Sequence, residues 1–248
     1  MGIVESIRIR LRGETFRPTL LSALVGSSFI SRSGLYRAIK GAAPQVNGKV
    51  LDFGCGSKPY EALFTNAVSY TGVDLETTGH DHVDSKVDVF YDGRTLPFQN
   101  GAFDAVVTFE VFEHVFNLPE ILAEIRRVTR DSGHLLISIP FTWSEHEIPY
   151  DFARYTTFGI SHILKTSGYE VLSISKTTTS LLTACQMFMD YLVQLGPRSW
   201  TRSFLQLFVI FPGTLISLTL NAILPKRYDS FCNTVVLARK CTGNRTTS

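Results

Sequence analysis

The segment Val50-Leu51-Asp52-Phe53-Gly54-Cys55-Gly56-Ser57 decides the fold. A short apolar run of this kind is typical of a buried strand, and here it enters a Gly-x-Gly turn, whose glycines let the backbone pass close to a ligand. Asp74 follows twenty residues after Gly54, at the end of another strand-like run. A carboxylate at that place can accept hydrogen bonds from ribose hydroxyls. The spacing therefore predicts a nucleotide-type site at the ends of two neighbouring strands.

A nicotinamide dinucleotide is the first competing ligand for this turn. Its G-x-G-x-x-G fingerprint needs a third glycine, and that place is held by Pro59. A proline there also removes an N–H group that a pyrophosphate could use. The turn therefore favours a ribose-bearing ligand that lacks a pyrophosphate.

Strand-like apolar runs alternate with helix-like segments along the chain. The runs lie at 49–53, 69–74, 103–109, 134–139, 169–175 and 234–239. One helix is expected after Asn117, whose side chain would cap it together with Glu120, and a second over 158–167, ending at Gly168. Strands that alternate with helices predict an α/β fold with parallel strand pairing.

Five motifs, in order and with the right spacing, resemble the class I S-adenosylmethionine-dependent methyltransferases, in particular the type 11 branch. Asp52–Gly56 is similar to the family's D/E-x-G-x-G, and Asp74 resembles the acidic end of its second strand. Asp92–Phe98 is similar to D-x-x-x-L-P-F. Residues 103–107 and 110–115 resemble the fourth strand and its E-V-L-E-H-V sequel. Residues 128–137 resemble L-K-P-G-G-x-L-x-I, with Asp131-Ser132 in place of Pro-Gly.

The resemblance implies a cofactor, a fold and a set of cofactor-binding residues. The cofactor would be S-adenosylmethionine. The fold would be a Rossmann-like, doubly wound sheet of seven strands with the last strand antiparallel. The domains would be an N-terminal helical extension (1–47), the cofactor-binding core (48–177), an apolar helical insert (178–228), and the last strand with a flexible tail (229–248). The residues expected at the cofactor are Asp52, Gly54, Cys55, Gly56, Asp74, Leu75, Asp92, Gly93, Glu110 and His114.

The loop that follows the strand-like run 134–139 is expected to hold the methyl acceptor, because ligands of doubly wound sheets bind beyond the carboxyl ends of the strands. Residues 146–156 resemble the H-E-x-P-Y-D-F-x-R-Y-T segment of methyltransferases from bacterial surface-glycan clusters, which suggests a sugar acceptor. His146 is the first candidate for the base that takes the acceptor's proton, and Asp151 is the second. His114 is a further catalytic candidate. The expected acceptor-binding residues are Trp143, Glu147, Tyr150, Arg154 and Tyr155.

Structural interpretations of the same residues stay open. Asp151 and Arg154 could form an internal salt bridge, His146 could lie on the loop surface, and His114 could pack at a helix start. His80 and His82 form an H-x-H pattern beside Asp81, which we interpret as a solvated loop, so no metal site is expected.

Residues 178–224 are more apolar than a soluble core requires and explain the mean hydropathy of +0.11. No residue is charged between Arg202 and Lys226, and Pro212-Gly213 is expected to break this run. A transmembrane span, a hairpin in the membrane surface, and a buried cap or homodimer contact are the alternatives, of which the surface hairpin is favoured. Four cysteines without a CxxC pair and no signal-like start favour a cytoplasmic protein, with a peripheral position on the inner face of the membrane left open.

The predicted activity is O-methylation of a sugar, glycan or lipid-linked acceptor. A lipophilic small molecule of the quinone or polyketide type is the alternative acceptor, and a non-catalytic cofactor-binding scaffold is the alternative function. A net charge of +2 indicates no nucleic-acid partner.

Overall fold

The computed structural model describes residues 16–24, 26–76, 85–196 and 199–242. The chain divides into two compact units. Unit 1 comprises residues 1–38 and 176–233, and unit 2 comprises residues 39–175 and 234–248.

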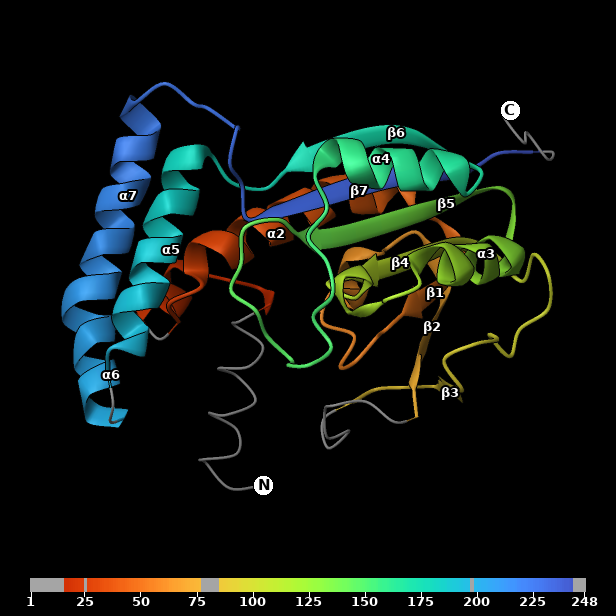
Figure 1. Ribbon diagram of the computed structural model, residues 1–248, viewed down its shortest axis with the longest axis horizontal. Helices are drawn as coiled ribbons and strands as arrows, with labels where there is room; N and C mark the ends of the chain where they lie inside the picture. Colours follow the sequence, from red (N-terminus) through yellow and green to blue (C-terminus); the bar gives the residue numbers. More distant parts are fainter. Residues whose placement is uncertain (1–15, 25, 77–84, 197–198, 243–248) are drawn as a thin grey trace. The chain divides into compact units, whose positions relative to one another are not determined.

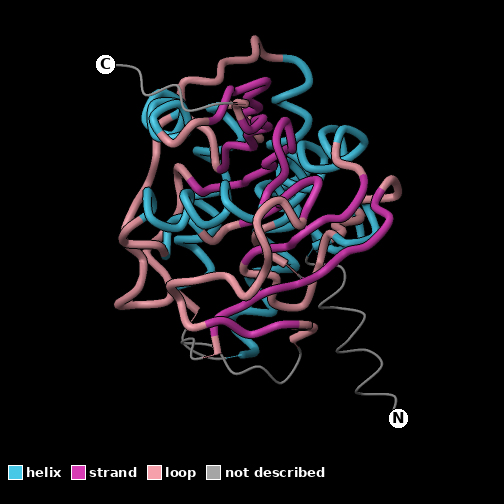
Figure 2. Tube along the Cα trace, turned by 90° about the vertical axis from the view of Figure 1, so that its right-hand side faces the viewer, coloured by secondary structure: helices cyan, strands magenta, loops and turns pink. Residues whose placement is uncertain are grey.

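Unit 2 contains a seven-stranded sheet in the order β3-β2-β1-β4-β5-β7-β6. Strands β1 to β5 are paired in parallel. The last strand, β7, runs in the opposite direction to β5 and β6 (Figure 1). The same ladder of strands is drawn in magenta in the view turned by 90° (Figure 2). The strands are β1 (Gly48–Phe53), β2 (Ala67–Leu75), β3 (Val89–Tyr91), β4 (Phe103–Phe109), β5 (Thr129–Pro140), β6 (Tyr169–Lys176) and β7 (Asn233–Lys240). This order and direction confirm the predicted fold class.

The middle of the sheet is covered on both faces, as its sequence requires. Val50 and Leu51 of β1 are both fully buried, and so are Val106 and Val107 of β4. Adjacent residues of a strand point to opposite faces, so a run of this kind needs apolar partners on each side. The helices α3 (Leu118–Val128) and α4 (Thr157–Thr166) supply buried residues to the main core cluster.

The start of α3 differs from the prediction. The Asn117 side chain makes no capping hydrogen bond; instead the backbone carbonyl oxygen of Asn117 accepts from the Glu120 N–H group. Pro119 lies in the first turn and has no N–H to offer, which removes one of the donors that a capping side chain normally accepts from.

Two strands, β3 and β5, differ most from the prediction. β3 has only three residues and was not among the predicted runs. β5 begins at Thr129 rather than at His134, because Ser132 takes a positive φ of 60° and the strand continues through an irregularity opposite Phe103–Ala105.

Unit 1 combines the N-terminal region with the apolar insert. Its elements are η1 (Leu20–Leu24), α2 (Phe29–Ala42, which continues into unit 2), α5 (Ser180–Gln194), α6 (Ser199–Leu205), the π-helical turn η5 (Gln206–Ile210) and α7 (Phe211–Ile223). A small core joins Phe29 and Ile30 to Met189 and Ile210. The buried Gln186 side chain accepts from the Ser31 N–H group and donates to the Ser27 carbonyl, so its polar atoms are satisfied.

The predicted break at Pro212-Gly213 is wrong. The helix runs from Thr201 to Ile223 without interruption, and α7 lies beside α5 (Figure 1). Pro212 is the second residue of α7, which begins directly after the wider turn η5, and a π-helical turn is one of the ways in which a helix accommodates a proline. By length and composition this helix could cross a membrane, and only 17% of its most apolar window is buried.

Short 3-10 turns complete unit 2. They are η2 (Ala43–Gln45), η3 (Glu61–Leu63) and η4 (Phe112–His114). The last of these begins three residues after β4 and carries a glutamate and a histidine at the carboxyl end of the sheet.

Candidate functional site

The turn after β1 has the backbone that the Gly-x-Gly pattern predicts. Gly54 and Gly56 both have positive φ, at 70° and 46°. A Cβ on Gly54 would lie 2.5 Å from Cγ2 of Val111, whereas a Cβ on Gly56 would meet nothing within 4 Å. The turn therefore needs glycine at both positions, and the space beside Gly56 is open to a ligand.

Asp74 lies at the end of β2, next to this turn. One carboxylate oxygen accepts from the Gly56 N–H group at 2.9 Å, and the other accepts from the Leu75 N–H group at 2.8 Å. Each carboxylate oxygen can accept more than one hydrogen bond, so both retain capacity for ribose hydroxyls. Asp74, at the end of the second strand, therefore lies against the glycine turn, as predicted.

Asp52 is enclosed beneath the turn. It is 2% exposed, and its carboxylate accepts a hydrogen bond of 2.7 Å from the Tyr70 hydroxyl. Burial raises the pKa of Asp52 to about 7, although the Tyr70 hydrogen bond opposes the shift. Burial likewise raises the pKa of Cys55 to about 12. Both side chains are buried beneath the turn and support it from the core.

The third strand end also lies at this edge. A Cβ on Gly93, whose φ is 81°, would lie 3.1 Å from Cδ2 of Leu75, so the turn after β3 is close to the end of β2. Asp92 accepts from the Arg94 and Thr95 N–H groups, and these hydrogen bonds lower its pKa. It is exposed and ionised at neutral pH, as a partner of an amino group would have to be.

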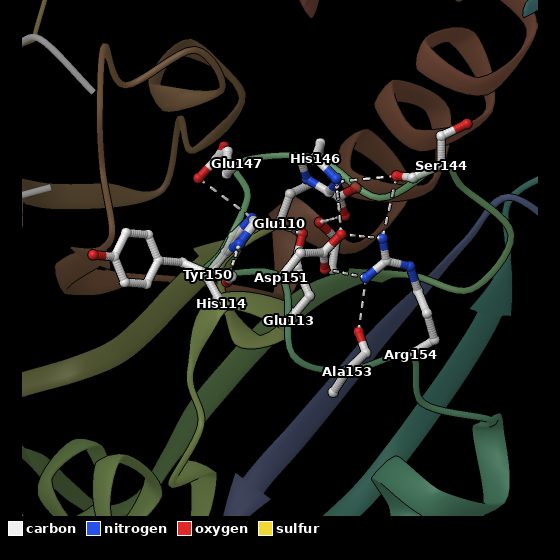
Figure 3. Close-up of polar contacts among 11 residues, drawn as sticks. Glu110, Glu113, His114, Ser144, His146, Glu147, Tyr150, Asp151, Ala153 and Arg154 are labelled. Atoms are coloured by element: carbon white, nitrogen blue, oxygen red, sulfur yellow. Dashed lines mark hydrogen bonds and ion pairs between the residues drawn. The ribbon is translucent and has the colours of Figure 1, made fainter. Parts of the chain in front are cut away.

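The loop between β5 and α4, residues 141–156, is called the acceptor loop here. Backbone hydrogen bonds hold it against the turn η4. The N–H groups of Phe152 and Ala153 both donate to the Glu113 carbonyl, at 2.8 and 3.2 Å. This contact places His146 beside His114, with ring centroids 4.9 Å apart (Figure 3). Two of the three predicted catalytic residues are therefore neighbours.

Each of these histidines has one ring nitrogen held by an acceptor. Nδ1 of His114 lies 2.9 Å from the Tyr150 carbonyl oxygen. Nδ1 of His146 lies 3.2 Å from Oδ2 of Asp151. Both acceptors favour a proton on Nδ1, which leaves Nε2 of each ring as a basic nitrogen.

Asp151 is the third predicted catalytic residue, and it is paired with Arg154. Its side chain is 3% exposed, and its oxygens accept from both terminal nitrogens of the guanidinium (Figure 3). The Arg154 hydrogen bonds hold the pKa of Asp151 at about 2. A carboxylate held in this way is a weak base, so the geometry favours Asp151 as the residue that orients His146. The salt bridge left open by the sequence is present.

The remaining predicted acceptor residues are less closely grouped. Glu147 has a positive φ of 53°, and its Oε2 lies 3.6 Å from Nε2 of His114. The Tyr150 ring is exposed and points away from the histidines (Figure 3). Tyr155 packs against the main core cluster, and Trp143 is half-buried. Their predicted contacts with an acceptor stay predictions.

Sequence reasoning missed three residues that the structure brings to this place. Glu113 is fully buried beside His114, and Phe116 and Phe152 form an exposed edge-to-face pair with ring centroids 5.4 Å apart. The E-x-x-E-H spacing of Glu110, Glu113 and His114 was a usable signal for the first. Nothing in the sequence marked the aromatic pair as one surface. The H-x-H pattern of His80 and His82 lies outside the described residues.

Comparison with known proteins agrees with this geometry. Residues 30–174 match the family model described as "Methyltransferase domain". The chain is 36% identical over 105 residues to a phthiotriol/phenolphthiotriol dimycocerosates methyltransferase of Mycobacterium leprae, covering 38% of this chain and 39% of that protein. It is 30% identical over 139 residues to a probable S-adenosylmethionine-dependent methyltransferase of Mycobacterium tuberculosis, covering 53% of this chain and 48% of the relative.

A solved structure agrees in fold. The phosphoethanolamine N-methyltransferase 2 of Haemonchus contortus, in complex with S-adenosyl-L-methionine, superposes with a TM-score of 0.52 at 20% identity, covering 94% of this chain and 60% of that chain. Likeness at this identity shows the fold alone. The family match and the relatives identify S-adenosylmethionine as the cofactor. The chain spans about half or less of the length of the curated relatives it matches.

Proposed function

The chain belongs to the methyltransferase domain family, and from this premise we propose that it transfers a methyl group from S-adenosylmethionine to a hydroxyl of a lipid-linked acceptor, such as a lipid-linked sugar. The observation that carries the proposal is the pair of neighbouring imidazoles, His114 and His146, at the carboxyl end of the sheet that also carries the glycine turn and Asp74. The acceptor hydroxyl would be bound and deprotonated there.

The donor half of the site consists of the strand ends of β1, β2 and β3. Asp74 would bind the ribose hydroxyls, and Asp92 would bind the adenine amino group. The open space beside Gly56 would let the cofactor lie close to the backbone of the turn. When bound, S-adenosylmethionine supplies a methyl group on a sulfonium, so transfer to an alcohol leaves a methyl ether, S-adenosylhomocysteine and one proton.

The acceptor half has to hold the hydroxyl in line and remove its proton. Alignment supplies a large part of the rate when the donor is already activated. The His146 imidazole would take the proton, and Asp151, which Arg154 holds ionised, would orient it. This assigns to Arg154 a positioning role through Asp151.

An apolar acceptor is supported by the surface around the histidines. Phe116, Ile148, Tyr150 and Phe152 are all exposed there, and Phe116 is 83% exposed. Exposed apolar groups that gather at a site usually mark a binding surface. The Mycobacterium leprae relative named above as acting on phthiotriol and phenolphthiotriol dimycocerosates supports a lipid-borne hydroxyl in the same way.

The helix Thr201–Ile223 supports a place for such an enzyme at a membrane surface. Its exposed large apolar residues are Phe204, Leu207, Phe208, Val209, Leu215, Ile216, Leu220 and Ile223. A helix with an apolar face of this kind lies in the membrane interface with that face buried in lipid. We propose that the insert makes this peripheral contact, on the cytoplasmic side. Flotation with liposomes tests it.

The activity is tested first by binding and then by turnover. Calorimetric titration with S-adenosylhomocysteine should give one site per chain, which Asp74→Ala should lose and Asp131→Ala, at a surface carboxylate, should keep. Absence of binding, or equal binding by Asp74→Ala, contradicts the proposed cofactor site.

The acceptor is then identified by mass spectrometry. Incubation with S-adenosylmethionine and a membrane lipid extract should add one methyl group to a lipid-linked alcohol. Methylation of soluble sugars alone would replace the lipid-linked acceptor by a soluble one. Binding of S-adenosylhomocysteine without any methyl transfer would instead favour the non-catalytic scaffold.

A further inference from the structure

The turn η4 contains a carboxylate that the proposed methyl transfer does not use. Glu113 is 0% exposed, and neither of its carboxylate oxygens has a hydrogen-bond partner among the described residues. Burying an ionised carboxylate without partners is among the most costly arrangements in a protein. The structure therefore calls either for a proton or for a cation at this place.

The two histidines lie next to this carboxylate. Nε2 of His114 is buried without a hydrogen-bond partner among the described residues and lies 3.7 Å from Oε1 of Glu113. One carboxylate oxygen of Glu113 and one ring nitrogen each of His114 and His146 all lie within 4.8 Å of one another.

One nitrogen of each ring is held in the way that is common in metal sites. Histidines that bind a metal almost always donate their second N–H group to a carboxylate or a backbone carbonyl, which sets the ring orientation. His114 has the Tyr150 carbonyl at Nδ1, and His146 has Asp151, which Arg154 holds in turn (Figure 3). The structure therefore already contains a hydrogen-bond acceptor at one nitrogen of each ring.

We propose that Glu113, His114 and His146 bind one divalent metal ion and leave one coordination position open for the acceptor hydroxyl. Two histidines and one glutamate form a donor set of catalytic zinc sites, in which the fourth position takes water or substrate. With bonds of about 2.0 to 2.2 Å, two ligands of a tetrahedral ion lie roughly 3.4 Å apart. The three ligand atoms lie within 4.8 Å of one another, so their side chains have to move together by up to about 1.4 Å to close on the ion.

The ion would take over the removal of the acceptor's proton, which is assigned above to His146; this step rests on the proposed function. A bound divalent ion lowers the pKa of a coordinated hydroxyl and so produces the alkoxide at neutral pH. The released proton can pass to the Glu147 carboxylate, whose Oε2 lies 3.6 Å from Nε2 of His114. The alkoxide oxygen then accepts the methyl group, so the reaction consumes no metal and yields the same products.

Titration with the metal ion alone tests the proposed site. Protein stripped with a chelator is titrated with Zn²⁺ in a calorimeter, as the full chain and as Glu113→Gln, His146→Ala and His162→Ala. His162 is an exposed histidine of α4 outside the cluster and serves as the matched control. We expect one ion per chain in the unchanged protein and in His162→Ala, and at least tenfold weaker binding in the other two variants.

Binding of S-adenosylhomocysteine to the same samples shows whether each variant is folded and separates the two proposals. No stoichiometric Zn²⁺ binding, or equal affinity in all four proteins, overturns the metal site and leaves Glu113 as a protonated buried acid. If S-adenosylhomocysteine binds in that case, the proposed function stands without the metal. If Zn²⁺ binds to the cluster but S-adenosylhomocysteine does not bind, the metal site stands and the proposed function falls.

Discussion

Replacing Asp52 by asparagine should stabilise the protein, and more so at pH 8 than at pH 5. The folded chain holds this buried carboxyl with a pKa of about 7, against an ordinary value of 3.8. Between these values the folded state binds a proton that the unfolded state has lost. Stability is therefore lost as the pH rises through this window. Asparagine keeps an oxygen for the Tyr70 hydroxyl and carries no charge to bury.

The size of the effect follows from the two pKa values. The full penalty of the ionised form amounts to about 4 kcal/mol above pH 7. At pH 5 only roughly 1.5 kcal/mol of it has developed, so the advantage of Asp52→Asn should grow by about 2.5 kcal/mol between pH 5 and pH 8. For a chain of 248 residues this corresponds to a relative rise in Tm of roughly 5–10 °C.

Thermal unfolding followed by circular dichroism at both pH values measures the difference. Asp229→Asn, at an exposed aspartate of the loop before β7, is the control and should show no such trend. An advantage of Asp52→Asn that is the same at pH 5 and pH 8, or that decreases with rising pH, would refute the argument from burial.

The other predictions concern the turn, the loop and the insert. Gly54→Ala should cost about 1–3 kcal/mol more in urea unfolding than Gly56→Ala, since only the first adds a close contact to the backbone strain; equal losses would contradict this difference. Arg154→Ala should lower stability by roughly 3 kcal/mol, because the buried Asp151 carboxylate then keeps only its contacts with His146; a loss below 1 kcal/mol would show that water replaces the guanidinium. Phe208→Ser should leave the Tm unchanged and reduce flotation with liposomes; unchanged flotation would exclude this side chain from the membrane contact.

The sheet was predictable because its signals are local. A buried strand before Gly54, an acidic strand end at Asp74 and the apolar stripe of α3 each follow from short-range periodicity. The alternation then fixes parallel pairing. The union of residues 16–38 with 176–233 in one unit was not predictable, because contacts such as Ser31 with Gln186 join parts of the chain 155 residues apart.

The site was predictable in its residue types and less so in its roles. The loop sequence named His146, Asp151 and Arg154, but only the structure shows that Arg154 holds Asp151 ionised and that Asp151 orients His146. Glu113 lay within a quoted motif. Its importance depends on complete burial without a partner, which no sequence pattern encodes.

The order of the strands has a consequence for how the chain folds during synthesis. β6 has β7 as its one neighbour in the sheet, and β7 follows only after the whole insert of unit 1. While the ribosome is still making α5 to α7, β6 has no strand to pair with, and unpaired strand edges are where nascent chains aggregate. Leu172 and Ile174 of β6 are exposed even in the finished fold. A nascent chain stalled before residue 233 should therefore need a chaperone, and one released after β7 should not.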